Sequence, residues 1–596
     1  MLLGTGDWLI VAAFFVVILS IGVLTSKKAG TSSTEFFLSG RNMPWWLLGV
    51  SMVATTFSTD TPNLVTDMVR THGVSGNWLW WAFLLTGMLT VFVYAKLWRR
   101  SKVMTDIEFY EIRYSGKPAA FLRGFRAIYL GVFFNVMIMA TVSLAAIKIG
   151  GVLLNLSPLQ TIAVAMLVTV IYTGLGGLRS VLATDFFLFS FAMFGAIMAA
   201  IVAVGLPEVN GLSNLFNHPN VVGKLNMLPD FSDSSNLIPI LIIPLAVQWW
   251  SVWYPGAEPG GGGYLVQQML SAKNEKNAMG ATLFFNGAHY ALRPWPWILV
   301  ALASLIVYPD LATLAAKFPH INPGIIKHDL AYPAMLTFLP RGILGIVVAS
   351  LIAAYMSTMA SHLNWGSSYV VNDFYKRFIK PTASEKELVA VGRLSTVLLM
   401  ILAGAVALLL SNALQAFHIL LQIGAGTGLI FILRWFWWRI NAYTEIAGMI
   451  VSFLVAFYLE IVHVKLGFQP LPDHINLLIG VGITTLAWLV VTFLTSPVDK
   501  GTLRNFYSLV RPGGRGWDKL LALLEKEGNP VEGRATKGDL PLGILCMIAG
   551  CLAVYCTVFA AGFYLYGNIV PAVITTVIAA IAAIFLIRTW GSLEMK

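Results

Sequence analysis

Long apolar segments recur along almost the whole chain, and they constrain its fold more than any other feature. A helix of about 20 apolar residues crosses the hydrocarbon core of a bilayer, and only helices or closed barrels satisfy their backbone hydrogen bonds there. We therefore predict an all-α polytopic membrane protein with about 14–15 transmembrane helices. The apolar runs lie at residues 7–25, 45–69, 78–98, 124–152, 157–174, 182–205, 238–255, 277–308, 331–372, 388–410, 413–437, 444–464, 474–496, 541–566 and 569–589.

The charge distribution is a topology signal. The 596 residues are 57% hydrophobic and 11% charged, with a net charge of +11. Cytoplasmic loops carry an excess of lysine and arginine, so we expect a multi-pass protein of the plasma (inner) membrane with its N-terminus outside and its C-terminus cytoplasmic. The lipid bilayer is then its surrounding partner, and nucleic acid is not one. The basic residues on the expected inner side include Lys27, Lys28, Arg99, Arg100, Lys102, Lys376, Arg377, Lys380, Arg434 and Arg439.

Two spans contain sequences that cannot continue as a regular helix. Residues 55–62 read TTFSTDTP, and residues 251–263 read SVWYPGAEPGGGG. Proline removes a hydrogen-bond donor and glycine loosens the backbone, and broken backbone in a membrane is tolerated when it lines a cavity. The breaks fall in the second and seventh spans, at matching places in two halves of five helices. This pattern indicates an inverted-repeat transporter with its binding site at the breaks; proline kinks packed against neighbouring helices are the alternative.

The spans and loops suggest a division of the chain into seven parts. The first apolar run has no basic region before it, so we expect a membrane helix rather than a cleaved signal peptide. The predicted parts are an N-terminal accessory helix and loop (1–44), a first five-helix repeat (45–205), an extracellular loop (206–237), an inverted second repeat (238–440), accessory helices (441–497), a cytoplasmic connector (498–540) and C-terminal accessory helices (541–596).

Five motifs occur in the order and at the spacing of one known family. They are Phe36-Phe37-Leu38-Ser39-Gly40-Arg41, Thr55-Thr56-Phe57-Ser58, Glu108-Phe109 with Arg113, Tyr172 to Leu178 followed by Ala183-Thr184-Asp185, and Ala353 to Thr358 with Asn372-Asp373. The chain thereby resembles the sodium/solute symporter family, the group that includes sodium–galactose transporters, from about residue 7 to about residue 465. The resemblance implies the leucine-transporter fold, sodium-coupled alternating access and no enzymatic activity.

The helix expected near 349–373 carries small residues and hydroxyls on one face. Such a stripe often packs against another helix, but Ser357, Thr358 and the carbonyl of Ala354 also form one turn of oxygen donors. Carbonyls of Ala54 and Phe57 at the first break complete a shell that suits sodium near the membrane midplane. The resemblance implies the same five residues as the main sodium site, so Na⁺ is the expected coupling ion.

A second sodium site is an open alternative. Relatives that couple two sodium ions use the aspartate of the Thr-Asp motif and serines of the same helix, which correspond here to Asp185, Ser357 and Ser361. Ala360 stands where the resemblance places a further serine, and Leu188 replaces the usual glutamine. Asp185 is equally explained as a packing or gating carboxylate bonded to nearby hydroxyls.

The solute is expected between the two breaks, among aromatic, amide and carboxyl groups that suit sugar hydroxyls. Against a sugar, the glutamine and lysine of sugar-transporting relatives are replaced at Thr61 and near Tyr290. Arg293 is the strongest signal for another solute, because an arginine within a span can clamp a carboxylate or pair with Glu258 or Asp60. The candidate solute residues are Thr56, Asp60, Thr61, Trp80, Asn135, Gln248, Ser251, Trp253, Tyr254, Glu258, Arg293 and Gln422.

These observations predict a sodium-coupled symporter that imports a small polar organic solute by alternating access, with a sugar favoured. A sodium-coupled carboxylate symporter that uses Arg293 is the alternative. A solute sensor or a channel on the same fold is a second one, although a channel would need a continuous polar pore. An enzyme is not expected, since no nucleophile–base or metal constellation occurs among the spans.

Overall fold

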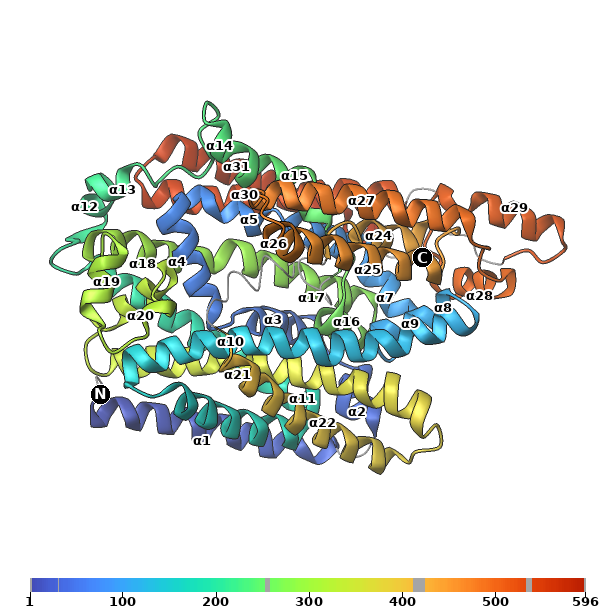
Figure 1. Cartoon of the computed structure of the whole chain (residues 1–596), viewed down its shortest axis with the longest axis horizontal. Coiled ribbons are helices and arrows are strands. Elements are labelled where there is room, and N and C mark those ends of the chain that lie inside the picture. The colour runs from blue at the N-terminus through green and yellow to red at the C-terminus, as the bar shows by residue number, and fades with distance from the viewer. Residues whose placement is uncertain (1–2, 30–31, 252–257, 411–423, 532–538, 594–596) are drawn as a thin grey trace.

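The computed structural model describes residues 3–29, 32–251, 258–410, 424–531 and 539–593, and in these ranges the chain folds as a bundle of helices (Figure 1). Ten helices of the described part are long and apolar enough to cross a membrane. Shorter apolar helices lie at Thr5–Ile21, Trp45–Thr56, Pro158–Val170 and Ser234–Ala246. The predicted all-α polytopic architecture is confirmed.

The second span is broken where its sequence turns polar. Helix α3 (Trp45–Thr56) ends at Phe57, whose φ of −89° and ψ of 66° are not helical, and α4 begins at Asp60. Pro62 lies in the first turn of α4, where its missing N–H would have no helical partner in any case. The break therefore leaves main-chain carbonyls at the end of α3 free to bind other groups.

The seventh span is interrupted as well. Helix α15 ends at Ala246, a short 3₁₀ turn follows at Gln248–Trp250, and α16 begins only at Gly263. Gly260 and Gly261 have φ angles of 84° and 98°, which only glycine adopts without strain. The two predicted breaks are thus present in the described residues.

Helix α21 (Ile343–Ser368) is the central element of the bundle. Almost all of its side chains are buried, as expected for a helix surrounded by others. It packs against α1, α3, α10, α11 and α22, and it continues as a π-helical segment over Tyr369–Ile379. Because other helices surround α21, little of its surface contacts lipid, and its hydroxyl groups face neighbouring helices.

The first half of the chain differs from the sequence prediction at one point. The spans expected at 157–174 and 182–205 form one helix, α11, of 47 residues, whose second part, Leu178–Val204, is the spanning one. The helices up to this point are α1 (Thr5–Ala29), α2 (Ser33–Leu38), α3 (Trp45–Thr56), α4 (Asp60–His72), α5 (Trp78–Trp81), α6 (Leu84–Leu89), α7 (Ala95–Ser101), α8 (Phe109–Arg113), α9 (Gly116–Ile128), α10 (Asn135–Ile149) and α11 (Pro158–Val204).

The middle of the chain supplies the partners of α3 and α10. Short π-helical segments join several helices into single spans, such as Glu275–Val307. The helices are α12 (Gly211–Asn217), α13 (Pro219–Val222), α14 (Ser234–Leu237), α15 (Ile243–Ala246), α16 (Gly263–Ser271), α17 (Glu275–Gly287), α18 (Pro294–Val307), α19 (Leu311–Lys317), α20 (Ala331–Leu336), α21 (Ile343–Ser368), α22 (Glu385–Ala407) and α24 (Gly428–Phe436).

The C-terminal helices form pairs at one side of the bundle (Figure 1). α25 packs on α27, and α30 packs on α31 and against α6. Between the pairs, α28 packs on α7 and α8, at the end of the molecule opposite the N-terminus. The bounds are α25 (Ala442–Phe457), α26 (His463–Lys465), α27 (Asp473–Leu494), α28 (Lys500–Val510), α29 (Asp518–Lys526), α30 (Asp539–Leu565) and α31 (Ile569–Thr589).

Candidate ion and solute site

Helix α21 meets the broken end of α3 through buried hydroxyl groups. Thr358 Oγ1 donates to the carbonyl of Thr55 over 2.7 Å, and the hydroxyls of Thr55 and Ser361 are 2.7 Å apart. The five residues predicted for sodium all lie on these two elements and are all buried: Ala54, Phe57, Ala354, Ser357 and Thr358. Hydroxyl and carbonyl oxygens at a helix break, without a full carboxylate among them, are a donor set that fits a monovalent cation.

Asp185 of α11 lies against the same turn of α21. Its Oδ1 accepts a 2.7 Å hydrogen bond from Ser357, and its Oδ2 accepts one from Ser51. Ser361, the third member predicted for a second sodium, instead contacts Thr55. The structure therefore brings Asp185 and Ser357 together and turns Ser361 toward the main predicted site.

A cavity of about 160 Å³ begins at the α3–α4 break. Thr56, Asp60, Thr61 and Trp80, all predicted from the sequence, line it. Further polar and aromatic residues line the cavity near the break. They are Thr55, Ser58, Asn63, Thr141, Tyr264, His289, Thr358 and His362. Thr358 is thus common to the cavity and the predicted sodium set.

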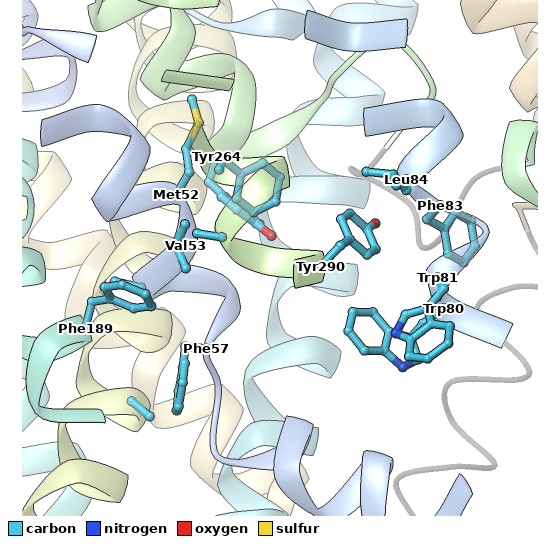
Figure 2. Close-up of a cluster of buried hydrophobic side chains, with 14 of the residues drawn as sticks. Met52, Val53, Phe57, Trp80, Trp81, Phe83, Leu84, Phe189, Tyr264 and Tyr290 are labelled. Atoms are coloured by element: carbon cyan, nitrogen blue, oxygen red, sulfur yellow. The ribbon is translucent and has the colours of Figure 1, made fainter. Parts of the chain in front are cut away.

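One wall of the cavity is aromatic. The Trp80 ring stacks on Tyr290, with centroids 5.5 Å apart and planes inclined by 21°. Its indole N–H donates to Asn77 over 2.9 Å, which fixes the ring. In Figure 2, Tyr290 lies between Trp80 and Tyr264. Such a wall offers an aromatic face to the apolar side of a solute.

Arg293 lies behind the cavity. Its side chain is fully buried, and its guanidinium donates to His289 Nδ1 over 2.6 Å and to Thr56 Oγ1 over 3.2 Å. It also lies 5.6 Å from the ring centroid of Phe57. Among the described residues it forms an ion pair with neither Glu258 nor Asp60, and Glu258 pairs with Arg126 instead. The side chains that Arg293 fixes, rather than Arg293 itself, line the cavity.

Besides Arg293, four predicted solute residues lie away from the cavity lining. Gln248 donates to the carbonyl of Leu79 over 2.7 Å, and Ser251 donates to the carbonyl of Val247 over 3.2 Å. Asn135 bonds to His362, and Glu258 pairs with an arginine of α9. Trp253, Tyr254 and Gln422 lie outside the described residues.

Glu258 belongs to a buried ion-pair cluster whose residues do not line the cavity. It pairs with Arg126, while Glu445 lies 3.5 Å from Arg434 and 3.8 Å from Arg126. Asp106 is buried beside them, and burial together with the charge of Glu258 raises the pKa of its carboxyl to about 6. The cluster ties α9, α24 and α25 to the segment that precedes α16.

The other end of the cavity is charged. Lys148 of α10 forms a 2.6 Å ion pair with Asp329, and both line the cavity together with Asp67 of α4. These residues, with His289, His362 and Tyr264, are absent from the sequence prediction. The lone charged residues Lys148 and Asp67 within apolar spans are the signal that points to them.

A sequence model described as "SSF: Sodium:solute symporter family" matches residues 36–452. The chain belongs to this family. Members of the family are sodium-coupled transporters rather than enzymes, so the chain is a sodium-coupled symporter, and sodium is its coupling ion.

Individual proteins resemble this symporter over most of its length. The sodium/glucose cotransporter of Vibrio parahaemolyticus is 25% identical over 484 residues, covering 78% of this chain and 86% of that protein. Sodium/myo-inositol cotransporter 2 of Oryctolagus cuniculus is 24% identical, covering 83% and 77%. Among solved structures, a Na⁺-coupled sialic acid symporter in a substrate-bound outward-open state superposes with a TM-score of 0.66 at 21% identity, covering 83% of this chain and 99% of that one. This solved neighbour has the leucine-transporter fold, which confirms the predicted fold.

Proposed function

We propose that this symporter imports a neutral, polyhydroxylated solute, a sugar or a close relative of one, together with sodium. The observation that carries the proposal is the cavity beside the α3–α4 break, which combines an aromatic wall at Trp80 with hydroxyl, imidazole and carboxyl groups. Aromatic faces cover the C–H side of a sugar, and polar groups read its hydroxyls. The named solutes of the sequence relatives, glucose and myo-inositol, belong to this class.

The position of Arg293 favours the neutral solute over a carboxylate. A clamp for a carboxylate needs free guanidinium N–H groups directed at the solute. The N–H groups of Arg293 are directed at His289, Thr56 and the carbonyl of Val53, and the residue does not line the cavity. A carboxylate would have to displace these contacts.

We place the main sodium at Ala54, Phe57, Ala354, Ser357 and Thr358, with Asp185, Ser357 and Ser361 as the candidate second site. Coupling then has a short physical path, because sodium would join the end of α3 to α21 while Thr56 and Thr358 face the solute. Each charge that moves inward through the membrane supplies about 2.3 kcal/mol per 100 mV. At about 1.4 kcal/mol per tenfold, voltage alone supports roughly fifty-fold accumulation of solute.

We further propose the orientation and the division of the chain given by its charges. An outside N-terminus places Lys148 and Asp329 on the outer side and the Arg126–Glu258 cluster on the inner side. Residues 45–205 and 238–440 would then be the two inverted repeats, and 498–540 the cytoplasmic connector. In that orientation the charged end of the cavity, at Lys148 and Asp329, lies toward the outside.

Uptake into proteoliposomes tests the function. We expect saturable uptake of at least one radiolabelled sugar or polyol that is concentrated against its gradient only with an inward sodium gradient. Amino acids, carboxylates and nucleosides are assayed in parallel. Sodium-driven uptake of carboxylates alone would overturn the neutral-solute proposal. Binding without accumulation would indicate a sensor, and uptake that does not saturate would indicate a channel.

A further inference from the structure

Two histidines line the cavity from different elements, and each is held through its Nδ1 atom. His289 lies in a π-helical segment at Ala288–Leu292, and His362 lies on α21. Both are buried. A neutral imidazole has one nitrogen that donates and one that accepts, so the partner of Nδ1 decides what the other nitrogen offers.

Asn135 determines the tautomer of His362. The Asn135 amide nitrogen donates to the carbonyls of His362 and Gly131, over 2.8 and 3.3 Å. Its oxygen must then be the atom 2.7 Å from His362 Nδ1. An amide oxygen only accepts, so Nδ1 carries the proton. The Nε2 atom of a neutral His362 is therefore an acceptor.

Gly366 makes this arrangement sterically possible. Its Cα lies so near the amide of Asn135 that a Cβ there would overlap the Asn135 Nδ2 atom and crowd the carbonyl of Gly131. Only glycine leaves room for the amide between α10 and α21, one turn after His362. The side chain of Asn135 is thus fixed by packing as well as by its hydrogen bonds.

Arg293 determines the opposite tautomer of His289. A guanidinium has donors only, and its Nη2 atom lies 2.6 Å from His289 Nδ1 and 3.3 Å from Nε2. The shorter contact identifies Nδ1 as the acceptor. The hydroxyl of Thr56, 3.0 Å from the same Nδ1, is compatible with this role. The proton of a neutral His289 is therefore on Nε2.

We propose that His289 and His362 are specificity-determining residues, His289 as a hydrogen-bond donor to the solute and His362 as an acceptor. Arg293 and Asn135 are positioning residues that fix the tautomers of His289 and His362, respectively. His289 offers an N–H to the solute and His362 offers a lone pair. The inference rests on the proposed function, since it assigns the cavity to the solute. It narrows the solute to one that presents an acceptor to His289 and a donor to His362.

The tautomers are tested directly by solid-state NMR of the full-length protein in lipid with labelled histidine. The difference spectrum between wild type and H362Q is expected to show the ring shifts of a neutral Nδ1–H imidazole. The difference between wild type and H289Q is expected to show a neutral Nε2–H imidazole. H289F keeps the ring packing against Trp80 and replaces H289Q if that variant is unstable. H320Q, at an exposed histidine, is the control. An opposite tautomer or an imidazolium at either site overturns the proposal.

The role in specificity is tested with deoxy and fluoro analogues of a transported sugar in proteoliposomes. Neither hydrogen nor fluorine can donate the hydrogen bond that a solute hydroxyl gives to His362. Both the deoxy and the fluoro analogue at that hydroxyl should therefore lose roughly five- to a hundredfold in uptake efficiency. A hydroxyl that accepts from His289 should be partly replaced by fluorine. In H362F and H289F, which have no acceptor or donor at these positions, the corresponding penalty should disappear, while H320Q retains the wild-type pattern.

The outcomes separate this inference from the proposed function. Absence of sodium-driven sugar uptake by wild type overturns the proposed function. It also overturns the role of the two histidines in solute specificity, whereas their tautomers are still tested by NMR. Normal sugar uptake with analogue penalties that persist unchanged in both histidine variants overturns the inference alone. N135A is expected to weaken the His362-dependent penalty and to shift the His362 tautomer signal, a change that loss of packing alone would not produce.

Discussion

The hydroxyl of Thr358 on α21 donates a 2.7 Å hydrogen bond to the main-chain carbonyl of Thr55 in the last turn of α3. This bond joins α21, whose side chains are almost all buried, to the element whose helix is interrupted at Phe57. The sodium site that we propose lies at this junction, and Thr358 also lines the cavity. If sodium and solute bind as we propose, Thr358 contributes to both sites, which gives the coupling a direct structural route.

Removal of either hydroxyl that we propose as a sodium ligand should weaken the binding of sodium. We expect Ser357→Ala and Thr358→Ala each to raise the sodium concentration for half-maximal uptake roughly tenfold, as for the loss of about one favourable polar interaction. Thr358→Ser should retain most of the affinity. Thr396→Ala removes a buried hydroxyl of α22 that bonds only within its own helix, and it should leave sodium dependence unchanged. Unaltered sodium dependence in both site variants would contradict the assignment.

Arg293→Gln should impair the uptake of every transported solute. The change removes the positioning contacts to His289 and Thr56 rather than a direct contact with solute. Arg293→Lys should not restore uptake, because a lysine lacks the planar fork that reaches both partners. Uptake of neutral and carboxylate solutes by the same proteoliposomes checks the expectation. Selective loss of carboxylate uptake, with neutral solutes unaffected, would instead indicate a direct clamp.

Trp80→Ala should raise the KM for a sugar more than it lowers the maximal rate. The stacked pair with Tyr290 provides the aromatic wall, and loss of such a face costs about 1 kcal/mol or more, which corresponds to roughly fivefold or greater. Trp80→Phe should have a smaller effect. Trp81→Phe alters a neighbouring buried tryptophan that does not line the cavity and serves as the control. Equal KM values for Trp80→Ala and wild type would argue against the aromatic wall as a solute contact.

Glu258→Gln should destabilise the folded protein strongly, because it leaves Arg126 as a buried charge whose closest carboxylate is lost. Both side chains are 3% exposed, and breaking a buried pair costs about 3–5 kcal/mol. Thermal or denaturant unfolding in detergent measures the effect. The double variant E258L/R126M, which removes both charges, should recover part of the loss. A double variant as unstable as the two single changes combined would show that the pair itself is not the cause.

Some features of this site follow from local sequence. Pro62 and the polar run before it predict the break of α3, since proline and competing hydroxyls disfavour a continued helix wherever the chain packs. Ser357 and Thr358 share a face of α21 because of helical periodicity alone. The candidate sodium residues could be predicted from the sequence for that reason, and the motif resemblance indicates the same positions.

Other features depend on contacts between distant parts of the chain. Glu258 and Arg293 are both charged residues of broken or polar spans, and nothing local distinguishes them. Packing places Glu258 against Arg126 in an ion-pair cluster and places Arg293 behind His289. His289 and His362 look like ordinary core histidines until the fold sets them on the walls of one cavity.

The sequence alone therefore determined the membrane class, the helical architecture, the two breaks and the face of α21 that carries oxygen donors. These properties depend on the hydropathy and backbone preferences of neighbouring residues, which act over a few turns. Only the tertiary structure decided which polar side chains face the cavity and which partner holds each of them. That outcome depends on hydrogen bonds such as Asn135 to His362, formed between residues 227 positions apart in the chain.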